Sequence, residues 1–516
     1  MATGRKQLAI NMVANLIAFG VQFGVSFVLT PYIISELGAK AYGFVPLANN
    51  FIGYTNIITV ALNSMASRFI SIEINRGNVE RANRYFNSVL IANSILAAVL
   101  LVPLALVVVF ANGFLDIPDG LLADVQGTFA FAFAGLELML VLSVFGCVYF
   151  VRNRIDLSAK RNIEGNVLRA AVLIALFTFV QPHIWFVTGT TMLVNVYLCL
   201  MNVRYTRELL PELRLNPRDF SWGAVRTLLG SGVWNSVNQL SVVLLTSLDL
   251  LLMNMFVGAQ ASGEYSIVKM LPTLIGQIVA VMVEVFVPQF TIQYARGRMG
   301  ELVESVEFSV KSLGAIVTVP IGFLIVFGGD FFRIWVPGQD ASLLQALSIL
   351  SLIPCIVTSS ISTVYNVYTV TNKLRTPALV WVGLGFVNVA MVVCLLKFTD
   401  LGIWVIPIVS LVMGVGRNLT FTPVYAARCL GVHWSTFYRC IFRACIGVVA
   451  SILISSLARA IVVPTGWPML FCLAAVCGTL GLLVNLVISF KPAERREFIA
   501  IGLAKLKKGK GSSSNG

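Results

Sequence analysis

The chain is poor in the residues that catalytic and metal sites use. Only two histidines occur among 516 residues, His183 and His433, and neither lies in a pattern typical of nucleophilic or metal chemistry. The nine cysteines are scattered, without the spacing of a zinc site or a disulfide framework. A Gly-x-x-x-x-Gly-Lys-Ser/Thr phosphate loop is also missing. We therefore expect neither an enzyme nor a bound metal or cofactor.

Charged residues are scarce as well, at 12% of the chain against 58% hydrophobic residues, and the mean hydropathy is +0.87. Such a composition excludes an ordinary soluble protein. Because a spanning helix needs roughly 20 mainly apolar residues, we predict an all-α polytopic membrane protein with fourteen spans. The predicted spans are residues 8–34, 41–66, 86–111, 127–150, 165–181, 184–203, 229–257, 264–290, 306–329, 342–370, 377–397, 402–425, 441–463 and 468–490. The first is too long for a signal-peptide core, so we expect it to be retained.

The net charge of +14 is distributed unevenly over the loops. When successive loops are assigned to alternate sides, most of the 37 Lys and Arg fall on the side that holds both termini. The opposite loops carry Lys40, Arg333, Lys397 and Arg459. This asymmetry predicts a protein of the cell membrane (the inner, cytoplasmic membrane) whose N- and C-termini lie in the cytoplasm. Because the basic residues follow the loops, it also argues against nucleic acid as the partner.

The second half of the sequence repeats features of the first at an offset of 220 residues. The segment 38–43 recurs at 258–263, Asn15 corresponds to Asn235, and Arg76-Gly77 corresponds to Arg296-Gly297. Duplicated helix bundles are common in transporters. We predict an N-lobe at 1–203, a cytoplasmic linker at 204–228, a C-lobe at 229–425, two further spans within 441–490 and a basic tail at 491–516.

Uncharged polar residues fall on single faces of four predicted spans. These residues are Asn11, Asn15, Gln22 and Ser26 in the first span, Asn49, Asn56 and Asn63 in the second, Asn235, Gln239 and Thr246 in the seventh, and Thr273 and Gln277 in the eighth. The repeat pairs the first two of these spans with the last two. We favour a wet lining of a central cavity, and the alternative is packing through hydrogen bonds between helices.

Charges inside spans are costly and therefore mark candidate functional positions. They are Glu137, Asp249, Lys269, Glu284 and Arg417. Lys269 can hold an anionic group, and Asp249 is the better candidate for reversible protonation, since burial disfavours a charged carboxyl. Alternatively, Asp249 is a static partner of Lys269 or Arg417. We leave out Lys311, and Arg169 near the predicted inner interface, because long basic side chains can snorkel.

Short motifs carry a resemblance to a known family. They are Pro31, Leu37-Gly38 and Tyr42-Gly43 near the first span, Phe256-Val257-Gly258 and Gly263-Glu264-Tyr265 after the seventh, and Phe332-Arg333-Ile334-Trp335. With the fourteen-span layout, these motifs resemble the lipid-linked polysaccharide flippases (Wzx-type) of the multidrug, oligosaccharidyl-lipid and polysaccharide (MOP) exporter superfamily.

The resemblance implies two six-helix lobes around a central cavity and movement of a polyprenyl-diphosphate-linked oligosaccharide to the outer leaflet by alternating access. It implies a lipid-linked glycan substrate, contact with membrane lipid, a coupling proton or sodium ion, and contact with glycan polymerase machinery. Lys269 and Arg417 fit the role of cations that meet the diphosphate. Unlike the peptidoglycan-precursor branch, this chain has no arginines within its first two spans, which favours a neutral or weakly acidic glycan.

The main alternative is a cation-coupled multidrug exporter on the same scaffold. In that case Asp249, Glu137 and Glu284 would be the coupling and drug-cation sites. An acidic cavity without Lys269 would favour it. A membrane-embedded glycan polymerase is a third class, but it needs a large outer loop, and this sequence has none.

Overall fold

The computed structural model describes residues 2–492 and Arg495, and within these residues the chain is helical with short connections and no strand. Fourteen helical segments of this part are long and apolar enough to span a membrane. The predicted fold class and span number are therefore confirmed. Most of the tail predicted at 491–516 lies outside the described residues.

The first half contains helices α1 to α8. Their bounds are α1 Ala2–Tyr42, α2 Phe44–Asn75, α3 Val79–Val109, α4 Ala111–Phe114, α5 Leu122–Leu142, α6 Cys147–Val151, α7 Ile155–Phe179 and α8 Trp185–Leu209. The 3₁₀ turn η1, Ser143–Gly146, joins α5 to α6, and η2 is Pro217–Asp219.

The second half contains helices α9 to α20. Their bounds are α9 Trp222–Val242, α10 Asp249–Phe256, α11 Ala259–Glu284, α12 Val287–Ala295, α13 Met299–Trp335, α14 Ala341–Ser360, α15 Tyr365–Val370, α16 Arg375–Phe398, α17 Val405–Thr420, α18 Thr422–Leu430, α19 Tyr438–Ile461 and α20 Trp467–Ser489. Three short turns interrupt them, the π-helical η3 Val243–Ser247, η4 Ser362–Val364 and η5 Gly402–Trp404.

Several helices extend beyond the predicted apolar segments. The helix α2 continues to Asn75 where the prediction ended at 66, and α13 begins at Met299 where the prediction began at 306. Hydropathy marks only the part of a helix that lies among lipid chains, because polar residues outside that part can continue the same backbone hydrogen bonds. The predicted span 342–370 is interrupted after Ser360 by the turn η4.

The repeat is visible in the backbone. Gly38 and its equivalent Gly258 both have positive φ, +78° and +119°, as do Gly77 and Gly297, at +76° and +69°. Only glycine adopts such angles without strain. The same turns therefore follow equivalent helices in both halves.

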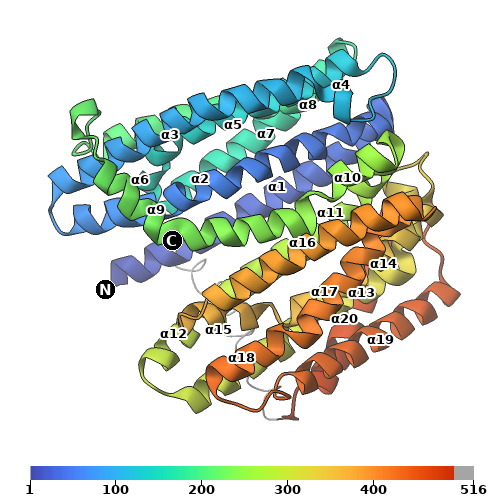
Figure 1. Ribbon diagram of the computed structural model, residues 1–516. Coiled ribbons are helices and arrows are strands. Elements are labelled where there is room, and N and C mark those ends of the chain that lie inside the picture. Colours follow the sequence, from blue (N-terminus) through green and yellow to red (C-terminus); the bar gives the residue numbers. More distant parts are fainter. Residues whose placement is uncertain (1, 493–494, 496–516) are drawn as a thin grey trace, which may run out of the picture. The chain divides into compact units, whose positions relative to one another are not determined.

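The chain divides into two compact units, residues 1–266 with 378–403, and residues 267–377 with 404–516. In the first unit α2 packs against α9 and α3, α5 against α8, and α7 against α1 and α8 (Figure 1). One buried cluster of this unit includes Ile70, Phe86, Val148 and Leu228, so α2, α3, α6 and α9 share an apolar core.

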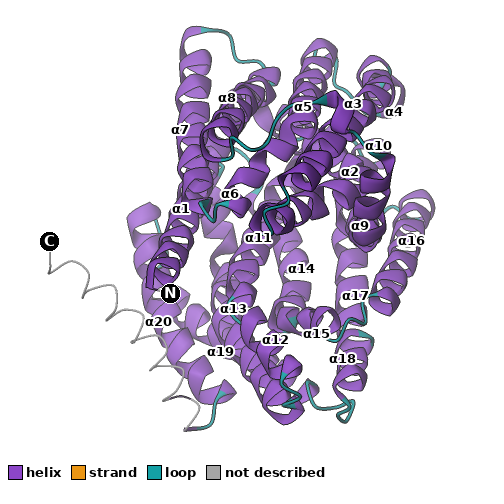
Figure 2. Ribbon diagram, turned by 90° about the vertical axis from the view of Figure 1, so that its left-hand side faces the viewer, coloured by secondary structure: helices purple, strands orange, loops and turns teal. Residues whose placement is uncertain are grey.

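The second unit is organised around the long helix α13, which packs against α14, α19 and α20 (Figure 2). Small residues allow close approach there, since a Cβ on Gly322 would lie 2.6 Å from the Cβ of Ser451 on α19. Asn485 on α20 is fully buried and donates to the Thr318 hydroxyl of α13 at 2.9 Å. Packing of small residues and interhelical hydrogen bonds therefore attach the last two spans to α13. The lobes at 1–203 and 229–425 have other boundaries than these units and stay a prediction.

Gly232 offers a test of the packing between α2 and α9. A Cβ at this position would lie 1.9 Å from the carbonyl oxygen of Ala61, whereas a Cβ on Gly230 would meet nothing within 4 Å. Gly232→Ala should therefore destabilise the protein by about 2 kcal/mol, since it forces the two helices apart. Thermal unfolding of the purified protein should show a lower midpoint than for the wild type, and Gly230→Ala should show no loss. Equal midpoints for the two variants would contradict this packing.

Candidate functional site

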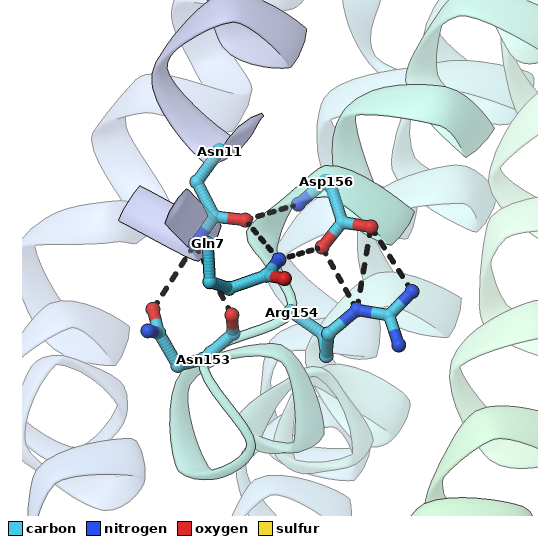
Figure 3. A network of polar contacts seen from close by, with 5 residues as sticks. All are labelled: Gln7, Asn11, Asn153, Arg154 and Asp156. Carbon is cyan, nitrogen blue, oxygen red and sulfur yellow. Dashed lines mark hydrogen bonds and ion pairs between the residues drawn. The ribbon is translucent and has the colours of Figure 1, made fainter. Parts of the chain in front are cut away.

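The polar face of α1 has two parts with different surroundings. Near the start of the helix, Asn11 is 3% exposed and donates to the backbone oxygen and the side-chain oxygen of Asn153, at 3.1 and 3.0 Å. Its own oxygen accepts from the backbone NH of Asp156 at 3.1 Å and from Gln7 at 3.0 Å. Figure 3 shows these contacts, with Asp156 also bound to Arg154 at 3.0 Å. Asn11 therefore attaches α1 to the connection between α6 and α7.

Asn15 and Gln22, which are predicted to line the cavity, are exposed on α1, and Ser26 is half-buried. Positions 15, 22 and 26 recur on one side of a helix with 3.6 residues per turn. An exposed amide within a span must meet water, protein or ligand, because lipid chains cannot hydrogen-bond to it. This part of the face has the hydrogen-bonding groups that a polar substrate needs.

The polar faces of α2 and α9 meet each other. Asn235 on α9 donates to the hydroxyl of Ser64 on α2 at 3.0 Å, and Gln239 reaches the backbone oxygen of Gly53 at 3.5 Å. On α2, Asn49 and Asn56 are exposed. The structure thus brings four predicted lining residues onto two packed helices, and Asn235 is both exposed and bonded to its neighbour.

Asp249 follows a distortion of the seventh span. The π-helical turn η3 ends with a hydrogen bond from the NH of Leu248 to the carbonyl of Val243 at 3.2 Å. Asn388 on α16 donates to the carbonyl of Leu244 in that turn at 3.1 Å. Asp249 is the next helical residue and is 4% exposed. Distortions of this kind are frequent at functional sites because they redirect the side chains that follow.

The helix α11 carries the predicted charged and polar residues of the eighth span. Lys269 is half-buried, Thr273 and Gln277 are exposed, and Glu284 is exposed as the last residue of the helix. The hydroxyl of Thr273 donates to the backbone carbonyl of Lys269 at 2.8 Å. Residues 269, 273 and 277 follow one another at four-residue intervals, so they lie on one side of α11.

Arg417 lies on α17 beside a buried hydrogen-bond cluster. Its Nε is 3.4 Å from the side-chain oxygen of Asn418, which is fully buried. That oxygen also accepts from Tyr365 at 2.7 Å, and the Asn418 amide donates to Thr358 at 2.6 Å. Asn418 thus connects α17 to α14 and α15 and holds the backbone on which Arg417 is placed.

Glu137 on α5 is half-buried, and its Oε1 has no hydrogen-bond partner among the described residues. A buried, unsatisfied carboxylate oxygen is costly unless it is protonated or binds a cation. This is compatible with the predicted coupling role, which stays a prediction for Glu137, Asp249 and Glu284. The lining and anion-binding roles predicted for the other site residues also stay predictions.

Two features were missed by the analysis of the sequence. Arg169 on α7 contacts the polar face of α1, since its Nη2 donates to the hydroxyl of Ser26 at 3.4 Å, and nothing in the sequence indicated this contact. His183 has a partner, since its Nδ1 lies 2.9 Å from the carboxylate of Asp124, and their distance in sequence gave no signal of this contact.

An all-helical chain with fourteen candidate spans and polar faces inside them is typical of multi-pass membrane transporters. A family model for polysaccharide biosynthesis proteins matches residues 8–292. The chain is also 30% identical, over 464 residues, to the uncharacterized membrane protein EpsK of Bacillus subtilis strain 168. This match covers 90% of this chain and 92% of EpsK. The chain therefore belongs to the polysaccharide biosynthesis protein family.

Solved structures show the same fold. The lipid II flippase MurJ, in an inward closed conformation, matches with a TM-score of 0.66 at 12% identity, over 92% of this chain and 98% of MurJ. An inward-facing multidrug resistance MATE family transporter of the MOP superfamily matches with a TM-score of 0.63 at 14% identity, over 82% of this chain and 97% of the transporter. The family resemblance drawn from the sequence motifs is confirmed by the family model and by EpsK, and these solved structures have the same fold.

The two parts of the α1 face should respond differently to mutation. Asn11→Ala removes hydrogen bonds of a buried side chain and should lower the unfolding midpoint, whereas Asn15→Ala changes an exposed amide and should leave it unchanged. We expect Asn11→Ala to cost about 1 to 3 kcal/mol. Thermal unfolding of both purified variants checks this, and a larger loss for Asn15→Ala would contradict the assignment.

Proposed function

We propose that this chain is a flippase that moves a polyprenyl-diphosphate-linked oligosaccharide from the cytoplasmic to the outer leaflet by alternating access, for surface polysaccharide synthesis. Family membership supports a role in polysaccharide biosynthesis, and the fold shared with MurJ and a MATE transporter supports transport. The proposal includes a cell (inner) membrane location with both termini cytoplasmic, as the distribution of Lys and Arg predicts. It assigns no catalytic step to the chain.

The observation that carries the proposal is the chemistry of the exposed polar residues within the spans. Asn15, Gln22, Asn49, Asn56 and Gln277 are amides, and all are exposed. An amide both donates and accepts hydrogen bonds, as a sugar hydroxyl does, so each of these residues can bind a glycan without favouring one charge. Polar side chains are tolerated inside a membrane when they line a water-filled space, whereas the same side chains facing lipid would be costly.

Within this proposal Lys269 holds the diphosphate, and Arg417 is a second cation for it. Lys269 is half-buried on α11. It shares its side of α11 with the exposed Thr273 and Gln277, which can contact the sugars. The cost of a charge in the apolar part of the membrane is offset when an anion binds to it.

The role of Lys269 can be tested by surface polysaccharide in cells that express variants in place of the wild type. Lys269→Ala should abolish transport, because the charge that meets the diphosphate is lost, and Lys269→Arg should retain much of it. Arg204→Gln is the control, because it also removes a positive charge, but from an exposed arginine near the end of α8 that pairs with Glu208. This variant should transport normally. Equal activity of Lys269→Ala and Lys269→Arg, at matched protein levels, would remove this role.

We further propose that Asp249, with Glu137 and Glu284, couples transport to a gradient of protons or sodium ions. The sequence has no phosphate loop for ATP, so a gradient is the available source of energy. Asp249 is buried directly after the π-helical turn. Charged and neutral carboxyl groups differ strongly in energy when they are buried, so a change in the charge of Asp249 would change the stability of the structure around it.

Asp249→Asn keeps the shape of the side chain but fixes it in a neutral form. Transport by this variant should no longer depend on the proton gradient, and an ionophore that collapses the gradient should therefore have no further effect. Measurement of transport with and without the ionophore checks this. An unchanged dependence on the ionophore would contradict a coupling role for Asp249.

The alternative function is export of cationic drugs on the same scaffold. The buried Asp249 and the half-buried Glu137 favour it, because acidic groups in spans attract cations. Family membership and the cation at Lys269 favour the glycan. Contact with glycan polymerase machinery remains part of the flippase proposal as a prediction about partners.

A further inference from the structure

Arg169 is a charged residue in the apolar part of a span and lies in the first compact unit. Arg169 lies five residues after Glu164 and ten residues before the end of α7 at Phe179, so about 15 Å of helix follows it. Its apolar surroundings include the buried cluster of Leu29, Ile33, Leu173 and Phe177, two of which follow Arg169 on α7 at one-turn intervals. The Arg169 side chain is half-buried and lies between α7 and α1.

The guanidinium group of Arg169 is poorly satisfied. Its one hydrogen bond to a described residue runs from Nη2 to the hydroxyl of Ser26 on α1, at a long 3.4 Å. Its Nε is buried and has no acceptor among the described residues. A guanidinium has five N–H donors in a planar fork, so most of this capacity is unused.

No carboxylate of the described residues neutralises this charge. The nearest acidic residues along α7 are engaged elsewhere, since Glu164 pairs with Arg161 at 2.6 Å and Asp156 pairs with Arg154 at 3.0 Å. A cation in the apolar part of a span that has no anionic partner costs about 2.5 to 3.5 kcal/mol on insertion scales. The cost is compensated when an anion with two acceptor oxygens binds to the fork.

The position of Ser26 connects Arg169 to the polar face of α1. Asn15 and Gln22 on that face are exposed, and Ser26 follows Gln22 by one turn. A ligand that contacts the amides of α1 can therefore place an anionic group within reach of both the Ser26 hydroxyl and the Arg169 guanidinium. This side of α1 is held in place by the buried contacts of Asn11 with the α6–α7 connection.

We propose that Arg169 and Ser26 form an anion-binding subsite for the transported molecule, on the first half of the chain and additional to Lys269. The inference rests on the proposed flippase function. The ligand is an oxyanion with at least two acceptor oxygens, either a phosphate of the lipid diphosphate or the carboxylate of an acidic sugar. Arg169 binds it through two parallel N–H donors, and Ser26 contributes its hydroxyl.

The direct test measures thermal stabilisation of the full-length purified protein by inorganic diphosphate and, separately, by glucuronate. Diphosphate should raise the unfolding midpoint of the wild type, Arg169→Gln should lose most of that shift, and Arg169→Lys should retain part of it. The same dependence on Arg169 with glucuronate alone would support the subsite and assign it to a sugar carboxylate. Shifts that are unchanged in Arg169→Gln for both probes would overturn the proposal.

Surface polysaccharide in cells gives a second readout. Arg169→Gln should reduce it at least tenfold, Arg169→Lys should restore part of it, and Arg204→Gln should be normal. Unfolding midpoints without ligand show whether a variant merely fails to fold. Normal polysaccharide in Arg169→Gln, with loss in cells that lack the chain, would overturn the subsite and leave the flippase function standing. Normal polysaccharide in cells that lack the chain would instead contradict the function itself.

Discussion

Lipid chains offer no hydrogen bonds, and this constraint determines how each polar residue in the fourteen spans is used. A polar side chain at that depth has to be satisfied by another helix, by water or by a ligand. Asn11, Asn418 and Asn485 are buried, and each is bound to a neighbouring element. Residues such as Asn15 and Gln277 are exposed instead. The first group holds helices together, and the second group is the one to which we assign substrate contact in the proposed function.

The same constraint explains the value of Arg169, Lys269 and Asp249 as candidate functional residues. Each places a charge where the membrane makes it costly, and the chain contains few such positions. The backbone before Asp249 is also distorted. Asp249 follows a π-helical turn whose carbonyl is bound by Asn388, so the geometry at this residue is supported by a second helix.

Hydropathy was sufficient to predict the fold class and all fourteen spans, because a spanning helix needs an unbroken apolar length that few other structures have. The repeat also predicted the shared turns, and Gly38 and Gly258 have positive φ in both halves. Hydropathy did not locate helix ends, since polar ends continue the helix without an apolar signal. This is why the second span was predicted to end at residue 66, although α2 continues to Asn75.

The candidate site could be predicted only in part. Periodicity placed Asn11 and Asn15 on one face of the first span, but it could not tell that Asn11 is buried against Asn153 while Asn15 is exposed. That difference depends on a connection 142 residues away in sequence. Periodicity within one helix reports which side chains share a face, and it contains no information about what packs against that face.

The central claim, that this chain moves a lipid-linked glycan across the membrane, is tested most directly in cells that lack it. The measurement is the fraction of polyprenyl-linked oligosaccharide on each leaflet, with surface polysaccharide determined in the same cells. Our account predicts that the oligosaccharide accumulates on the cytoplasmic leaflet and that surface polysaccharide is lost. An unchanged distribution with normal polysaccharide and increased sensitivity to cationic drugs would contradict it and favour a multidrug exporter.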